Sequence, residues 1–155
     1  MGDMFCTLLQ LTESKHSELL ILLDKTIEQQ AELNNDNIEE IDAIADFKQM
    51  QIDTINEIDQ AYALLYRTYC NENKGEKTLV GSEMIGYEKL QAKRTENAQI
   101  MHKIHAISDE NIVALSQKMK ELERQITQVN TGKKGMNAYT QNSVSGGVYI
   151  DQKIL

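Results

Sequence analysis

The sequence contains no proline and no tryptophan, and aromatic residues make up only 5% of its 155 positions. With so few large rings, a thick globular core is hard to fill, and a thin, elongated core is easier to build. The longest uninterrupted aliphatic run is Leu19 to Leu23, far short of the roughly 20 apolar residues that a membrane-spanning helix requires. We therefore expect a soluble protein with one domain, since single domains commonly hold about 100 to 200 residues.

Cysteine and basic charge are also scarce. Cys6 and Cys70 are the only thiols and lack metal-ligand spacing, so we expect both to stay unpaired in a reducing cytoplasm. The formal net charge of -8 opposes the basic footprint of nucleic-acid-binding proteins, and an anionic membrane surface would repel it. Asp3 lies near the amino terminus with no basic region before the leucines, which argues against a secretory signal. These features predict a cytoplasmic protein with no nucleic-acid partner and no membrane insertion.

Two long stretches, residues 3–74 and 87–131, contain no glycine and are rich in residues that favour helices. The run Asn34-Asn35-Asp36-Asn37 interrupts the first stretch, and Asp36 followed by Glu39 resembles a capping box that starts a second helix. The sequence thus predicts an all-α fold, an elongated antiparallel three-helix bundle or coiled coil over residues 1–131. The predicted helices span about residues 3–34, 36–70 and 84–131.

Apolar residues recur at alternating spacings of three and four, which is typical of helices that pack along a seam. In the second helix the seam is Ile41, Ile44, Lys48, Gln51, Ile55, Ile58, Tyr62, Leu65 and Tyr69. A row beside it, which gives this face room for two neighbours, is Ile38, Ala45, Ile52 and Tyr66. The first helix supplies Phe5, Leu8, Leu9, Leu19, Leu20, Leu23, Ile27 and Ala31. The third offers one continuous register, Ala98, Met101, His105, Ser108, Ile112, Leu115, Met119, Leu122, Ile126 and Val129.

Few residues suggest chemistry. His102 and His105 share a helical face, but a structural zinc site needs four ligands and a di-iron bundle needs Glu-x-x-His pairs. Neither these two nor His16 has the surroundings of a phosphotransfer histidine, and no phosphate loop or nucleophile elbow is present. Lys48 is interpreted as a lysine that reaches out of the seam to solvent, with a functional role as the alternative. We expect no catalytic residue, no metal and no cofactor.

Two segments break the helical pattern. Residues 71–86 are interpreted as a loop whose apolar residues, Leu79, Val80, Met84 and Ile85, pack over one end of the bundle. After Val129 the composition shifts to Gly, Ser, Asn and Thr. We expect residues 132–155 to form a flexible tail that becomes ordered when a partner binds.

A family resemblance rests on three segments. These are Gln29-Gln30-Ala31-Glu32-Leu33 running into Ile38-Glu39-Glu40-Ile41 with Ile44 and Lys48, a later helix with Asn111 in its middle, and the closing Gly147-Val148-Tyr149-Ile150-Asp151-Gln152-Lys153. With this order of elements, nearly the whole chain resembles the FlgN family of flagellar export chaperones. The loop at residues 75–86 departs from the family pattern, so the resemblance says nothing about its role.

The resemblance implies a non-catalytic cytoplasmic chaperone that binds the terminal amphipathic helix of hook-filament junction proteins. Such a chaperone keeps its client, the protein it binds, unassembled and delivers it to the flagellar type III export gate. The client-binding residues it implies are Met119, Leu122, Ile126, Val129, Met136, Tyr139, Val144, Val148, Tyr149 and Ile150. Tyr139 is also our candidate for a contact with the export gate.

Two alternatives stay open at this point. The four helical residues of that set fit plain core packing as well, and the apolar residues of the tail fit an incidental distribution. The chain as a whole also fits a structural or adaptor coiled coil that self-associates without a client. We expect a monomer or a weak homo-oligomer.

Overall fold

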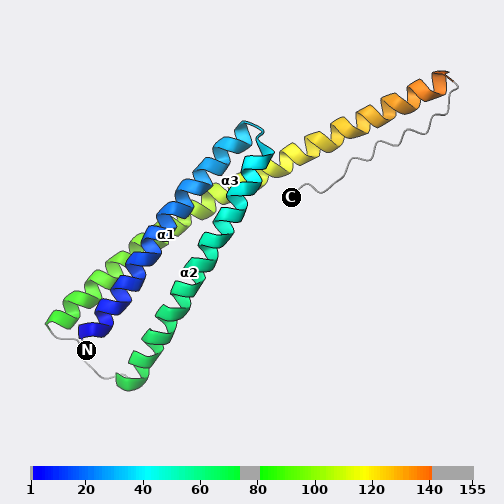
Figure 1. Cartoon of the computed structure of the whole chain (residues 1–155). Coiled ribbons are helices and arrows are strands. Elements are labelled where there is room, and N and C mark those ends of the chain that lie inside the picture. The colour runs from blue at the N-terminus through cyan, green and yellow to red at the C-terminus, as the bar shows by residue number, and fades with distance from the viewer. Residues whose placement is uncertain (1, 74–80, 141–155) are drawn as a thin grey trace. The chain divides into compact units, whose positions relative to one another are not determined.

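The computed structural model describes residues 2–73 and 81–140, and nearly all of them are helical (Figure 1). The three helices are α1 (Gly2–Asn34), α2 (Ile38–Asn73) and α3 (Ser82–Thr140). Within these ranges there is no strand, so the predicted all-α fold is confirmed. The chain divides into two compact units, Met1–Asn111 and Ile112–Leu155, and α3 contributes to both.

The third helix is longer than predicted. Helix α3 continues to Thr140 instead of ending at residue 131, so the first part of the segment assigned to the tail is helical. Gly132 and Gly135 are isolated within the helix, and each costs only about 1 kcal/mol relative to alanine, which is too little to end it. The first compact unit ends at Asn111. The rest of the tail, residues 141–155, lies outside the described residues, as do residues 74–80 of the predicted loop.

The turn between α1 and α2 has a defined hydrogen-bond pattern. Asp36 adopts a positive φ of 57°, and the amide of Asn37 donates to the carbonyl of Glu32 at 3.2 Å. The amide of Asp36 donates to the carbonyl of Leu33, which completes a Schellman motif at the end of α1. The side-chain oxygen Oδ1 of Asn37 then accepts a hydrogen bond from the backbone amide of Glu40. The cap of α2 is therefore Asn37, one residue after the predicted Asp36.

Helices α1 and α2 pack antiparallel. The rings of Phe5 and Tyr69 lie 5.4 Å apart, and Lys15 Nζ lies 2.7 Å from Asp59 Oδ1. All nine predicted seam positions of α2 are buried or half-buried, and no other position between 38 and 72 is. The seam prediction is confirmed. The row beside the seam, Ile38, Ala45, Ile52 and Tyr66, remains exposed, because α1 and the first part of α3 both pack on the seam itself.

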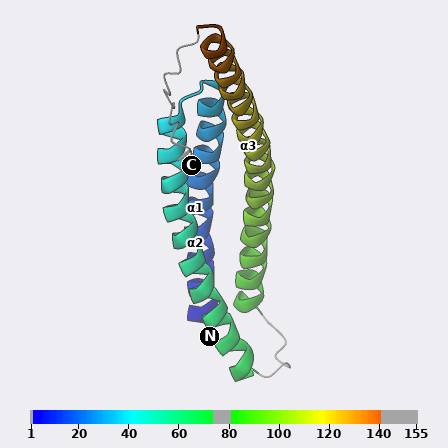
Figure 2. The ribbon, with the colours of Figure 1, turned by 90° about the vertical axis from the view of Figure 1, so that its right-hand side faces the viewer.

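Helices α1 and α3 run in the same direction (Figure 2). The amide group of Asn97 donates to the carbonyl of Thr12 at 3.1 Å, and that of Asn111 donates to the carbonyl of Thr26 at the same distance. Both pairs are separated by 85 residues in the sequence. The two contacts therefore repeat the same geometry after two heptads, which fixes a parallel register between the helices.

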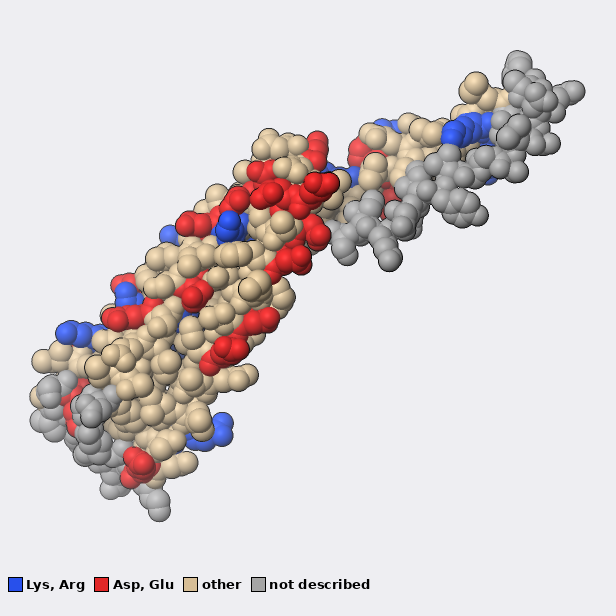
Figure 3. Space-filling model, in the orientation of Figure 1, with Lys and Arg blue, Asp and Glu red and all other residues tan. Residues whose placement is uncertain are grey.

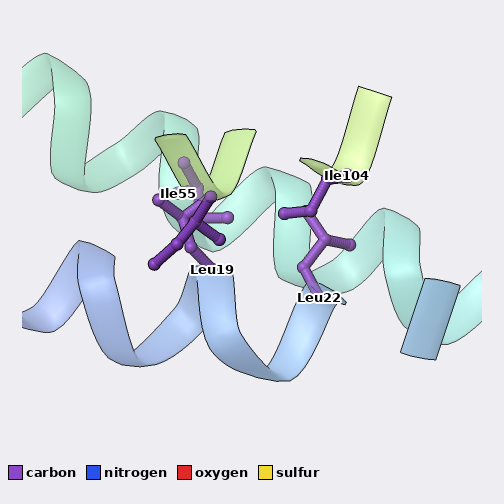
Figure 4. Close-up of a cluster of buried hydrophobic side chains, with 5 residues drawn as sticks. Leu19, Leu22, Ile55 and Ile104 are labelled. Carbon is purple, nitrogen blue, oxygen red and sulfur yellow. The ribbon is translucent and has the colours of Figure 1, made fainter. Parts of the chain in front are cut away.

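The core of the first unit alternates between apolar and polar layers. Side chains from all three helices form one cluster, Leu19, Leu22, Ile55, Ile100 and Ile104 (Figure 4). A second cluster is Phe5, Leu8 and Leu90. Along α1 and α3, the contact between Thr12 and Asn97 lies between the two clusters. The contact between Thr26 and Asn111 follows the Leu19 cluster, and all four residues are buried. A buried amide makes its hydrogen bond only in one register, so these layers favour a single alignment of α1 and α3.

The polar layers explain where the predicted registers fail. On α1, Leu20 and Ile27 are 43% and 47% exposed, and Ala31 is exposed as well. On α3, Ala98 and His105 are exposed. The buried positions are instead Leu22 and Leu33 on α1 and Ile100 and Ile104 on α3. Thr12, Thr26, Asn97 and Asn111 occupy seam positions, so a search for apolar residues alone misses the true heptad.

Replacing Asn97 with alanine tests this layer. The variant loses the bond to the Thr12 carbonyl and a second one at 2.8 Å between Asn97 Oδ1 and His16 Nδ1. We expect the free energy of unfolding in urea to fall by about 1 to 3 kcal/mol. The matched control Asn56→Ala, on the exposed surface of α2, should change it by less than about 0.5 kcal/mol. Equal effects of the two substitutions would contradict the claim that the Asn97 hydrogen bonds stabilise the packing of α1 against α3.

Lys48, in the seam of α2, makes the stability of the protein depend on pH. Its ammonium donates to Gln29 Oε1 at 3.1 Å, and burial lowers its pKa from the ordinary value of 10.5. The unfolded chain therefore binds more protons between the lowered pKa and 10.5, so stability rises with pH in that window. Lys48→Met removes this contribution. We expect the stability of the wild type relative to Lys48→Met, measured by urea unfolding, to increase towards pH 10.5, and a constant or falling difference would refute this account.

Candidate partner-binding surface

The residues predicted to hold a client fall into three groups. Met119 and Ile126 are half-buried, whereas Leu122, Val129 and Met136 are 38%, 58% and 70% exposed. Tyr139 belongs to α3, but its side chain is not among those that the structure describes. The remaining predicted residues, Val144, Val148, Tyr149 and Ile150, lie beyond the described part of the chain. The structure therefore brings together only the helical members of the set.

The helical members lie on one face of the second unit. We call this face the α3 stripe and define it as Leu115, Met119, Leu122, Ile126 and Val129. Spacings of four, three, four and three residues place these side chains in one row along a helix. None of the five is fully buried. Apolar side chains in a row on a helix are the typical surface for contact with another amphipathic helix.

The helix beneath the stripe is supported by contacts within itself. Arg124 donates to both carboxylate oxygens of Glu121, and Gln125 also donates to Glu121. These hydrogen bonds lower the pKa of the Glu121 carboxyl. The hydroxyls of Thr127 and Thr131 bond to carbonyls one turn earlier. All of these polar groups lie outside the stripe, which leaves the apolar row free of polar contacts.

The α3 stripe continues only part of the seam that α3 uses in the first unit. Leu115, Leu122 and Val129 follow the half-buried Met101 at steps of seven, whereas the fully buried row ends at Asn111. That row holds Leu90, Asn97, Ile104 and Asn111 seven residues apart, and all four are buried. Continued by the same step, it would meet Lys118 and Gln125, which are polar. The apolar residues move instead to the next position, Met119 and Ile126. Ile112, where the shift begins, is 65% exposed.

A groove of about 260 Å³ in the first unit was not predicted from the sequence. Its apolar lining includes Ile58 and Met101, and the guanidinium of Arg94 lies 5.4 Å from the ring centre of Tyr62. The Tyr62 hydroxyl is buried without a hydrogen-bond partner in the described structure, and burial raises its pKa. The volume is below the roughly 300 to 1,000 Å³ of most small-molecule sites and suits a single side chain of a partner better.

The remaining candidate groups are ordinary surface and bundle residues. Cys6 and Cys70 are free and exposed. His16 pairs with Asn97, and His102 and His105 are exposed on α3. The described residues include no group of three or more side chains that could hold a metal ion. Across the same residues, no helix is both long enough and apolar enough to span a bilayer.

Comparison with known proteins adds no relative. No protein-family model, no curated protein and no solved structure matches this chain.

Proposed function

We propose that this protein is a non-catalytic export chaperone of the bacterial flagellum that works in the cytoplasm. In this proposal it binds the terminal amphipathic helix of a hook-filament junction protein, keeps that client unassembled and delivers it to the export gate. The proposal is supported by the resemblance carried by the hairpin sequence, Asn111 and the closing residues. The observation that carries it is the α3 stripe, an apolar row in which no member is fully buried.

The proposed mechanism is helix-on-helix packing. An amphipathic client helix anchors at positions i, i+3, i+4 and i+7, and these are the spacings of the α3 stripe. Full burial of a Leu, Ile, Val or Met side chain stabilises a contact by about 1.5 to 3 kcal/mol relative to full exposure, and the more exposed members, Leu122 and Val129, gain most. A client whose apolar face is covered in this way has no free face for assembly with its own kind.

Residues 132–155 supply the second part of the proposed client site. They combine the last turns of α3 with the segment that carries Val144, Val148, Tyr149 and Ile150. A chain that orders on binding adds contact area at the cost of its conformational entropy. Tyr139 is the residue we propose for the contact with the export gate, because of the resemblance.

Deletion of residues 132–155 tests the proposal. We expect the full chain to form a complex with a hook-filament junction protein in isothermal titration calorimetry. The truncated chain should lose that complex while circular dichroism shows that the three helices remain. A shorter deletion, of residues 141–155, separates the contribution of the final segment from that of α3. If the chain lacking residues 132–155 binds the client at full strength, the assignment of this segment is wrong.

A further inference from the structure

The exposed row on α2 is a second apolar surface, and each of its members stays exposed in the described structure. We call it the α2 stripe and define it as Ile38, Ala45, Ile52 and Tyr66. Ile38, Ile52 and Tyr66 are 61%, 37% and 42% exposed, and Ala45 is exposed as well. A step of seven residues separates Ile38, Ala45 and Ile52, so they lie in one row along the helix. Such a row is a docking surface for another helix.

The α2 stripe lies within a strongly acidic surface. Between residues 36 and 59 the only cation is Lys48, against the carboxylates Asp36, Glu39, Glu40, Asp42, Asp46, Asp53, Glu57 and Asp59. Acidic side chains gather along α2 and at its turn with α1 (Figure 3). Asp59 pairs with Lys15, whereas Glu39, Asp42 and Asp46 have no ion pair in the described part of the chain. A helix that docks here therefore needs positive charge beside an apolar row.

The chain itself contains a helix of that kind. Between residues 112 and 136, the cations Lys118, Lys120, Arg124, Lys133 and Lys134 outnumber the carboxylates Glu121 and Glu123. The same segment carries the α3 stripe, so it combines an apolar row with a net positive charge. This composition is opposite to that of the rest of the chain, whose overall formal charge is -8. The segment thus combines an apolar row with the charge that is opposite to that of the α2 surface.

We infer that residues 112–136 of one copy dock on the α2 stripe of a second copy. The inferred assembly is a reciprocal dimer, in which each copy contributes one of each surface and the two contacts are identical. The contact covers the α3 stripe when no client is present, and a client helix displaces it. The inference depends on the charges and exposed rows alone, and it does not require the proposed client.

The first test uses the full chain without any client. Sedimentation velocity should show a dimer at low salt, and raising the salt from about 0.05 M to about 1 M, where the screening length is about 3 Å, should increase the dissociation constant at least about tenfold. A chain that stays monomeric at all concentrations would overturn the inference. A dimer that salt does not weaken would overturn it as well.

A charge-swap experiment identifies the two surfaces. The first variant reverses the α2 surface with Glu39→Lys, Asp42→Lys and Asp46→Lys. The second reverses the α3 surface with Lys120→Glu, Lys133→Glu and Lys134→Glu. Each variant alone places like charges across both contacts, so we expect it to be monomeric, with helicity by circular dichroism as the control for folding.

An equimolar mixture of the two variants should restore the dimer. In the mixed dimer both contacts again join opposite charges, because the lysines added to α2 meet the glutamates added to α3, and the native surfaces meet each other. We expect the dissociation constant of the mixed dimer to lie within about threefold of the wild-type value. Mispaired charges should instead raise the dissociation constant at least about tenfold. Failure of the mixture to dimerise, with both variants helical, would show that these surfaces do not meet.

Discussion

Replacing Leu19 with alanine is expected to lower the free energy of unfolding by about 3 to 5 kcal/mol, since the change opens a cavity at a fully buried site. Leu19 is 0% exposed and belongs to the cluster that joins all three helices. The neighbouring Leu20 is 43% exposed, so Leu20→Ala should cost less than about 1 kcal/mol. Urea unfolding monitored by circular dichroism measures both values.

The comparison of these two neighbours is a direct test of the register. The two substitutions remove the same atoms from the same helix, so differences in helix propensity cancel. If Leu20 also faced the core, the free energy of unfolding would fall by comparable amounts in both variants. If Leu20→Ala destabilised the protein as much as Leu19→Ala, the assignment of Leu19 to the core-facing side of α1 and of Leu20 to its exposed side would be wrong.

Aspartate at two positions of the α3 stripe should have the largest effect on function. We expect Leu122→Asp with Ile126→Asp to weaken binding of a junction protein at least about 100-fold, because two central apolar anchors are replaced by charges that would be desolvated in the contact. Titration calorimetry measures the affinity, and circular dichroism checks that the helix remains.

The matched control for this pair is Val113→Asp. Val113 is 55% exposed on the same helix and lies outside the stripe, so its replacement introduces one aspartate, of the same kind as the two in the double variant, without touching the proposed contact. We expect its affinity to stay within about threefold of the wild type, as for peripheral residues of most interfaces. Equal losses for Val113→Asp and the double variant would indicate a general effect of charge rather than a contact through the stripe.

The sequence predicts the fold class because its long glycine-free stretches are rich in helix-favouring residues and repeat apolar residues at spacings of three and four. It also predicts the seam of α2, where Lys48 and Gln51 are flanked on both sides by isoleucines that make the pattern evident. The seams of α1 and of the first part of α3 are predicted only in part. Phe5, Leu8 and Leu19 are buried as expected, whereas Leu20 and Ile27 are exposed. There, Thr12 and Asn97 pair across the helices, and nothing local in either helix identifies a threonine or an asparagine as a core residue.

The candidate surface is only partly predictable for a similar reason. The spacing of Met119, Leu122, Ile126 and Val129 identifies an apolar face, but a spacing cannot say whether the face is buried or exposed. The single register drawn from Ala98 to Val129 hid the end of the fully buried row at Asn111. The acidic surface of α2 and the basic segment of α3 are both visible in the sequence, yet their relation depends on which α2 residues remain uncovered.

Site-specific photo-cross-linking tests the central claim, that the α3 stripe is the surface that binds the client. A photoreactive residue replaces Ile126, on the stripe, or Gln128, exposed on another face of the same helix. With a junction protein present, we predict adducts between position 126 and the client's terminal helix, and few from position 128. Client adducts from positions on α2, with none from position 126, would contradict the account.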